Sequence, residues 1–197
     1  LNSGKLTKDE KNELLSIAEN EDEIKSRFSS NLVFGTGGLR AIMKTGMNAM
    51  NIHTVAHATQ GLASHILSVR READGVVIAS DSRNNAEQFS KAAASVLAAN
   101  GIKVYLFESM RPTPELSFAL RELSCVAGIN ITASHNTKEY NGYKVYWDDG
   151  AQLSLDYAEK ISCRINETDI FTGVKTMNFD NAIADGLIEI IGNEMDV

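Results

Sequence analysis

The chain has 197 residues, which is enough for one domain with a substantial core but not for several large domains. A formal net charge of −7 without any Lys/Arg cluster argues against nucleic acid as a partner, and there is no apolar run of about 18 residues that would predict a membrane span. The two cysteines, Cys125 and Cys163, form no CxxC pair, so we expect no disulfide framework and a cytoplasmic protein.

The first thirty residues have the character of a helical arm. Residues 7–29 are rich in Glu, Lys and Asn with sparse apolar positions, which predicts one or two helices against the outside of the domain. The glycines of Gly35-Thr36-Gly37-Gly38 then interrupt the pattern and predict a loop with exposed backbone. We therefore divide the chain into an N-terminal helical arm, residues 1–30, and a domain, residues 31–197.

Apolar runs and amphipathic segments then alternate along the chain. The apolar runs typical of buried strands occupy residues 76–79, 102–107, 126–132 and 143–147. Helices are expected over 53–70, from a cap at Asn84 or Asn85 to Gly101, from Thr113 as cap with Pro114 at the first helical position, and over 154–165. The tail from Asn178 is a linker or a final helix. This alternation predicts a three-layer α/β/α domain with a mixed, mainly parallel sheet of about four strands.

The strongest chemical signal is the polar segment that follows the third predicted strand. Thr132-Ala133-Ser134-His135-Asn136 begins a loop at the carboxyl end of that strand, where open α/β sheets bind ligands. Asn141-Gly142 favours positive φ and predicts a sharp turn that brings Lys144 to the base of the loop. Two interpretations remain open from the residues alone: Ser134 carries a phosphoryl group near these cations, or the segment is a solvated loop with an Asn-Gly turn.

Two further loops could contribute to the same site. Backbone amides in the glycine segment and the Arg40 guanidinium could bind an oxyanion, although such a segment could also be only a turn. It matches neither the dinucleotide fingerprint nor a P-loop. Ser80-Asp81-Ser82-Arg83 follows the first predicted strand, and Asp81 either holds the strand-to-helix turn through backbone amides or acts in catalysis. We predict that these loops, Ser134–Asn136 and Lys144 converge on one edge of the sheet.

Other candidate sites are weaker. His53 and His57 have the i, i+4 spacing of zinc ligands, but no third ligand is evident, so we interpret them as surface histidines. A Ser-His-Asp hydrolase needs a histidine that approaches the serine from elsewhere in the fold, whereas His135 is the neighbour of Ser134 in sequence.

Taken together, Phe34–Arg40 (FGTGGLR), Thr132–Asn136 (TASHN) and Tyr140–Lys144 (YNGYK) resemble motifs of the α-D-phosphohexomutase superfamily. TASHN with YNGYK looks like the active-serine loop of that family, and FGTGGLR looks like its N-terminal arginine loop. The sequence of these motifs is most similar to the branch of phosphoglucomutases and phosphopentomutases. Two departures are Thr137, where the family usually has Pro, and Ala41, where Gly often follows the arginine.

The resemblance implies a role for each motif residue. Ser134 would carry the phosphoryl group and, as phosphoserine, give one oxygen to Mg²⁺; His135 would lie beside it as a polar group of the active site. Lys144 and Arg40 would contact the serine and its phosphate, with Lys144 as proton-transfer partner. The implied substrate or phosphate contacts are Gly37, Gly38, Arg40, Asn136 and Lys144. The substrate would be a phosphorylated hexose or pentose, and a bisphosphate of the glucose 1,6-bisphosphate type would serve as activator.

Some family features do not occur in the chain. A metal loop of the form DGDxDR is absent, and so are the sugar-recognition and C-terminal phosphate-binding domains. The resemblance thus implies domain I alone, inactive by itself, whose partners are the remaining domains of the same parent chain. The alternative is a non-catalytic phosphorylatable or phosphate-binding interaction module.

Overall fold

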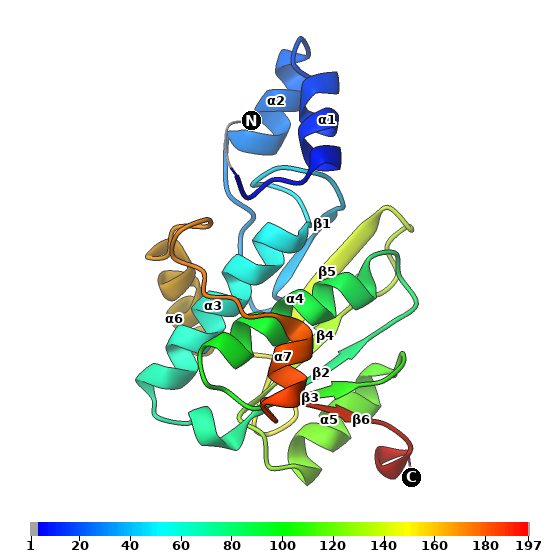
Figure 1. The fold of residues 1–197 in the computed structure, drawn as a ribbon, viewed down its shortest axis with the longest axis vertical. Helices are drawn as coiled ribbons and strands as arrows, with labels where there is room; N and C mark the ends of the chain where they lie inside the picture. The colour runs from blue at the N-terminus through cyan, green and yellow to red at the C-terminus, as the bar shows by residue number, and fades with distance from the viewer. Residues whose placement is uncertain (1–3, 197) are drawn as a thin grey trace.

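A six-stranded sheet forms the centre of the computed structural model, which describes residues 4–196 (Figure 1). In spatial order the strands are β1 (Leu39–Ile42), β5 (Tyr140–Trp147), β4 (Ala127–Ile131), β2 (Val76–Ser80), β3 (Val104–Phe107) and β6 (Ile188–Ile191). Strands β4, β2, β3 and β6 are parallel neighbours, whereas β5 runs antiparallel to both β4 and β1. The predicted mixed, mainly parallel sheet is confirmed, with six strands rather than about four.

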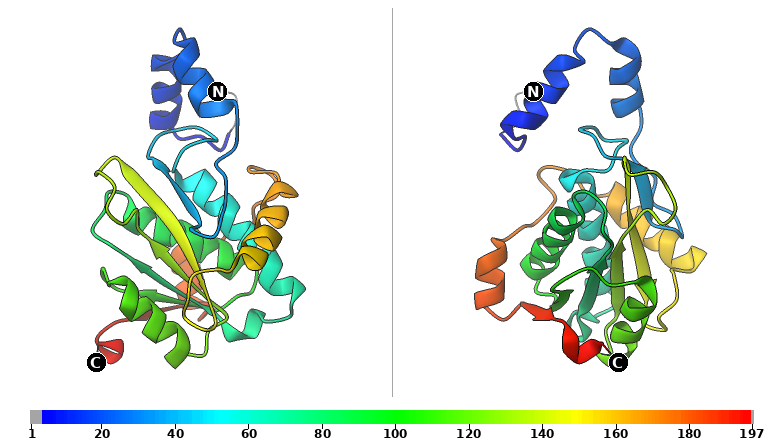
Figure 2. Two further views of the ribbon diagram at one scale, coloured as in Figure 1. Left: turned by 180° about the vertical axis from the view of Figure 1, so that it is seen from behind. Right: turned by 90° about the vertical axis from the view of Figure 1, so that its right-hand side faces the viewer.

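Helices cover both faces of this sheet, as Figures 1 and 2 show. One face carries α3 (Ile52–Ser68) and α4 (Ala86–Ala99), with α6 (Leu155–Asn166) packed on α3 and α7 (Phe179–Ala184) packed on α4. The other face carries α5 (Thr113–Glu122), which lies over β2 and β4. Tyr146 of β5 also packs in the cluster beneath α5, whereas on the same side β1 and the Tyr140 end of β5 lie outside the region that α5 covers. None of the helices in the described range is long and apolar enough to span a membrane.

The core is divided between the two faces by the alternation of side chains along the strands. Val76 and Ile78 of β2 join the larger cluster beneath α3 and α4, whereas Val77 and Ala79 join the smaller cluster beneath α5. The same alternation puts Tyr143, Val145 and Trp147 of β5 in the larger cluster. Even-numbered residues of β5 therefore lie on the α5 side of the sheet.

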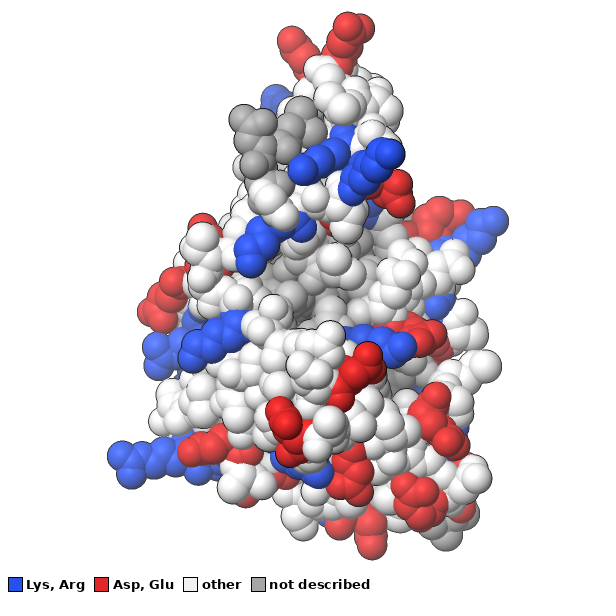
Figure 3. Space-filling model, in the orientation of Figure 1, with Lys and Arg blue, Asp and Glu red and all other residues white. Residues whose placement is uncertain are grey.

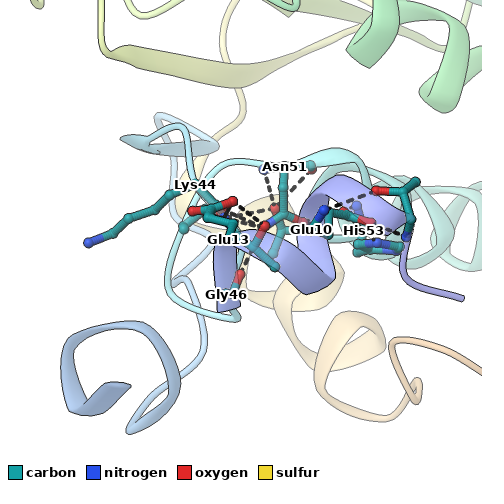
Figure 4. A network of polar contacts seen from close by, with 10 residues as sticks. Glu10, Glu13, Lys44, Gly46, Asn51 and His53 are labelled. Carbon is teal, nitrogen blue, oxygen red and sulfur yellow. Dashed lines mark hydrogen bonds and ion pairs between the residues drawn. The ribbon is translucent and has the colours of Figure 1, made fainter. Parts of the chain in front are cut away.

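Two helices, α1 (Lys8–Ser16) and α2 (Glu21–Phe28), form an arm beyond one end of the sheet (Figure 1). Glu13, which lies beside Lys44 and Gly46 in Figure 4, connects the arm to the domain. Its carboxylate accepts hydrogen bonds from the Thr45 amide at 3.2 Å and hydroxyl at 2.5 Å, and it pairs with Arg27. Burial raises the pKa of Glu13, but these hydrogen bonds outweigh it and the pKa is lowered overall. The prediction of one or two helices is confirmed as two.

Three local predictions were wrong. Asn141-Gly142 is not a turn but lies inside β5, because Gly142 is paired on both sides, with Arg40 of β1 and with Thr132 after β4. The N-cap of α5 is Pro112 rather than Thr113, whose hydroxyl instead accepts a hydrogen bond from Asn130 of β4 at 2.8 Å.

The tail after Asn178 is also more structured than a linker or a final helix. It contains α7 and then β6, which pairs in parallel with β3.

Candidate active site

The loop that carries Ser134 connects β4 to β5 at the carboxyl edge of the parallel strands. Ser134 and His135 are exposed there, and the Ser134 hydroxyl has no hydrogen-bond partner among residues 4–196. Ser134 has a φ of 59°, in the left-handed region that few residues other than glycine adopt. Residues with strained backbone conformations are found mostly at functional sites, and Ser134 is such a residue, exposed at the edge where ligands bind.

A chain of hydrogen bonds ties the start of this loop to the turn after β2. The Ser134 amide donates to Thr132 Oγ1 at 3.0 Å, and the Thr132 hydroxyl donates to Asp81 Oδ2 at 2.5 Å. Asp81 Oδ1 accepts the Arg83 amide at 3.0 Å, so Asp81 also holds the strand-to-helix turn. Of the two interpretations of Asp81, the structure supports the turn-holding one.

The Arg83 side chain holds the rest of the loop. Nη2 donates to the carbonyl oxygens of Ser134 at 2.8 Å and Asn136 at 2.7 Å. Nη1 donates to those of Thr137 and Tyr140, each at 2.9 Å. Sequence reasoning singled out the segment of Arg83 but missed these contacts. The signal in the sequence was an arginine in the turn after a neighbouring strand, β2, at the same edge.

Arg40 and Lys144 lie on one face of the sheet, the side of β1 and β5 that α5 leaves open. Arg40 pairs with Gly142, and Lys144 is two residues further along β5, so both side chains leave the sheet on the same side. Gly142 puts no side chain between them. Neither cation has a hydrogen bond or ion pair with another residue in the described part of the chain. Both charges are thus available to an anion.

The register brings these cations close to the serine loop. Thr132 donates its amide to the Gly142 carbonyl at 3.0 Å, and Gly142 faces Arg40 on its other side. A continuous row of paired backbone groups therefore crosses the sheet from Arg40 through Gly142 to Thr132, which lies two residues before Ser134. Backbone and side-chain contacts thus bring together all the predicted segments, including the turn around Asp81.

The glycine segment before β1 is a tight turn. The Gly38 amide donates to the Gly35 carbonyl at 2.8 Å, and the Gly35 amide donates back to Gly38 at 3.1 Å. The Gly38 amide is therefore committed to the turn, whereas the Gly37 amide has no hydrogen bond with another described residue. Of the two glycines expected to contact phosphate, only Gly37 retains a free amide donor.

Gly38 has a second, steric reason to be glycine. Its φ is 73°, and a Cβ would lie 1.9 Å from the Tyr143 carbonyl oxygen. We expect Gly38→Ala to lower the free energy of unfolding by more than about 3 kcal/mol, because the backbone of β5 cannot move aside. Urea unfolding measures this loss.

Gly101 provides the matched control. Its φ is 75°, but nothing lies within 4 Å of its would-be Cβ. Gly101→Ala should therefore lose only the left-handed strain of about 1–2 kcal/mol. Equal losses at the two positions would contradict the close packing of the glycine turn on β5.

The remaining predicted residues differ in whether they have hydrogen-bond partners. His135 has no hydrogen bond with another described residue, while the buried Asn136 Oδ1 atom lacks a partner within residues 4–196. His53 and His57 are not unpaired surface histidines, because each has a polar partner. His53 Nε2 lies 2.9 Å from Glu10 Oε1, and His57 Nε2 lies 2.7 Å from the Thr168 carbonyl oxygen.

The described residues do not by themselves form a magnesium site. Within residues 4–196, no group of three or more His, Cys, Asp or Glu side chains could hold a metal ion. The carboxylate of Asp81, which bonds into the serine loop, is already engaged by Thr132 and lies 3.3 Å from Arg83 Nε. Mg²⁺ requires near-octahedral oxygen coordination, and Ser134 would supply only one ligand.

Charge on the face of the molecule that Figure 3 presents is mixed. Figure 3 shows acidic and basic side chains interspersed over one face, with no continuous basic patch there. Because the formal net charge of the chain is −7, the potential for binding an anion depends on the few unpaired cations around the serine loop and not on a general positive field.

Comparison with known proteins relates this geometry to a family. Residues 31–170 match the family model of the phosphoglucomutase/phosphomannomutase alpha/beta/alpha domain I. The phosphopentomutase of Homo sapiens is 41% identical over 160 residues, which cover 77% of this chain and 26% of that protein. The phosphoglucomutase of Staphylococcus aureus strain USA300 is 44% identical over 151 residues, which cover 76% of this chain and 27% of that protein. The chain thus spans about a quarter of the length of these relatives.

A solved structure agrees with the match. A crystal structure from Thermus thermophilus, described as that of a phosphomannomutase, superposes with a TM-score of 0.64 at 29% identity. The superposition covers 79% of this chain and 35% of the other.

Proposed function

Since the chain belongs to the phosphoglucomutase/phosphomannomutase family, in which it corresponds to domain I, we propose that it is the catalytic-serine domain of a longer cytoplasmic phosphosugar mutase. The enzyme interconverts a sugar 1-phosphate and a sugar 6-phosphate, or a 5-phosphate for pentoses. One observation carries the proposal: an exposed serine held in a left-handed conformation lies at the same corner of the sheet as two unpaired cations, Arg40 and Lys144.

The proposed reaction begins with phosphorylated Ser134. The free hydroxyl of a sugar monophosphate attacks the phosphorus, the bond from phosphorus to Ser134 Oγ breaks, and a sugar bisphosphate forms. The attacking hydroxyl loses its proton, and Ser134 Oγ gains one; Lys144 serves as partner in this proton transfer. The bisphosphate then turns over in the site and returns its other phosphoryl group to Ser134, which releases the isomeric monophosphate.

The residues of this chain act by positioning and charge neutralisation, which is the main task of a protein in phosphoryl transfer. Arg40 offers a planar fork of donors to phosphate oxygens, and Lys144 offers a point charge. Gly37 adds a free backbone amide, and His135 and Asn136 flank the reacting group. We propose that Mg²⁺ is held mainly by a metal loop elsewhere in the parent chain and that a bisphosphate of the glucose 1,6-bisphosphate type primes Ser134.

A coupled assay tests the proposed function. The parent enzyme, given glucose 1,6-bisphosphate and Mg²⁺, should convert glucose 1-phosphate or a pentose 1-phosphate, and chelation of the metal should stop turnover. The 197-residue chain should show no measurable turnover, because the metal ligands and the distal phosphate clamp lie outside it. Turnover by this chain at the rate of the parent, or a parent that converts none of these phosphates, would contradict the proposal.

A further inference from the structure

The most extensive set of contacts at the site belongs to Arg83, a residue that the proposed reaction does not use. Its side chain is only 12% exposed and donates to four carbonyl oxygens between Ser134 and Tyr140. We propose that Arg83 is a positioning residue that fixes the Ser134 hydroxyl for phosphoryl transfer. This inference rests on the proposed function of Ser134.

The loop has few other constraints of its own. Within it, the Asn136 amide bonds to the Ala133 carbonyl at 3.2 Å, and the Tyr140 amide bonds to the Thr137 carbonyl at 3.1 Å. Ala133 at its start is buried in the core, but the side chains of Ser134, His135 and residues 137–139 are exposed and contribute no core packing. The Met43 amide also donates to the Glu139 carbonyl at 2.8 Å. A connection of this kind is ordinarily mobile, and the Arg83 guanidinium, which donates to four of its carbonyl groups, is its most extensive side-chain constraint.

The contacts of Arg83 and Thr132 fix both peptide groups that flank Ser134. Thr132 Oγ1 accepts the Ser134 amide at 3.0 Å, and Arg83 Nη2 donates to the Ser134 carbonyl at 2.8 Å. The direction of the Cα–Cβ bond follows from these two peptide planes, so the hydroxyl is limited to the few positions that the staggered χ1 rotamers allow. A left-handed residue persists only where its surroundings over-determine it, and here those surroundings are two identified side chains.

Asp81 connects the two residues, Thr132 and Arg83, that hold the peptide groups of Ser134. Its Oδ2 atom accepts the Thr132 hydroxyl, and its Oδ1 atom accepts the amide of Arg83. The turn after β2, itself hydrogen-bonded to the end of β4 through the Asp81 amide and the Ile131 carbonyl at 3.2 Å, is therefore the rigid support of the serine loop.

Only arginine has the geometry for this task. The guanidinium presents five donors in a rigid plane, whereas lysine has one compact ammonium on a flexible stem. A lysine at position 83 keeps the charge but cannot hold four carbonyl groups at once. Misplacement of a reacting atom by about 1 Å can lower a rate about 100-fold, so both Arg83→Lys and Arg83→Ala should slow the transfer to Ser134.

A single-turnover experiment on the full-length parent enzyme tests the proposal. The dephosphorylated enzyme is mixed with ³²P-labelled glucose 1,6-bisphosphate, and the rate and final extent of Ser134 labelling are measured. We expect both variants to be labelled about 100-fold more slowly than the wild type but to the same final extent. Arg71→Ala is the matched control, because Arg71 forms two ion pairs, with Asp74 and Asp148, at the opposite end of the sheet.

The two measured quantities separate positioning from folding. Wild-type rates in both Arg83 variants would overturn the proposal. A reduced extent with an unchanged rate for the labelled fraction would also overturn it, since Arg83 would then only support folding. If the wild-type enzyme is not labelled at all, the function proposed for Ser134 is wrong, and the role of Arg83 fails with it. If the wild-type enzyme is labelled and the Arg83 variants are labelled at the same rate, only the role of Arg83 is wrong.

Discussion

Replacement of Ser134 by alanine in the parent mutase should abolish turnover, because alanine has no oxygen to accept a phosphoryl group. Stability should change little: the side chain is exposed, its hydroxyl has no partner among the described residues, and both residues place the same Cβ on the left-handed backbone. A coupled assay with glucose 1-phosphate and a thermal unfolding curve measure the two properties.

Ser82→Ala is the matched control for this variant. Ser82 is also an exposed serine at the carboxyl edge of the sheet, in the neighbouring loop after β2. It should retain wild-type turnover. Normal turnover by Ser134→Ala would return the Ser134 segment to the interpretation of a solvated loop.

The second large effect is expected at the two cations. Arg40→Ala and Lys144→Ala should each lower kcat by about 100-fold or more, because each removes one charge-assisted donor from the transferring phosphoryl group. Neither side chain bonds to another described residue, so the fold should remain intact. Steady-state kinetics of the parent enzyme, with circular dichroism as a check of folding, measure these effects.

Lys103→Ala is a suitable control for Lys144→Ala. Lys103 precedes β3 and binds the Gly186 carbonyl oxygen at 2.9 Å and Glu189 at 2.9 Å, away from the serine loop. Its loss should affect stability more than kcat. If Arg40→Ala and Lys144→Ala turn over as fast as Lys103→Ala, the anion-binding role of the open sheet face is wrong.

The buried strands of the fold were predictable because their sequence is nearly continuous in apolar residues. Val76-Val77-Ile78-Ala79 lies between two polar segments and is typical of a buried strand, and β2 is central in the sheet. The strands β1 and β6 were missed because each has four residues at an edge of the sheet. Such a strand is defined by its partner more than by its own sequence.

The Asn141-Gly142 pair shows where local preference misleads. This dipeptide is the usual signal of a tight turn, yet Gly142 lies in the middle of three strands. A Cβ there would lie 2.5 Å from the Thr132 carbonyl oxygen and 2.9 Å from that of Leu39. Close approach of two backbones, and not a positive φ, requires the glycine, and only the sheet pairing reveals this.

The placement of the candidate site residues was predictable to the extent that their motifs are contiguous, whereas their roles stay a prediction. Ser134, Arg40 and Lys144 lie in short segments whose residue types left two interpretations open, and the resemblance to the phosphohexomutase motifs favoured phosphate chemistry. The contacts of Arg83 with the serine loop join residues more than fifty positions apart. No periodicity or spacing in the sequence encodes such contacts, because they arise only when β2 and β4 become neighbours.

The central claim, that Ser134 carries the phosphoryl group, is tested most directly by labelling the parent enzyme with ³²P-labelled glucose 1,6-bisphosphate and mapping the labelled peptide. We predict one label per chain, on the peptide that contains Ser134, and no label in Ser134→Ala. Label on a peptide without Ser134, or undiminished labelling of the alanine variant, would contradict the account.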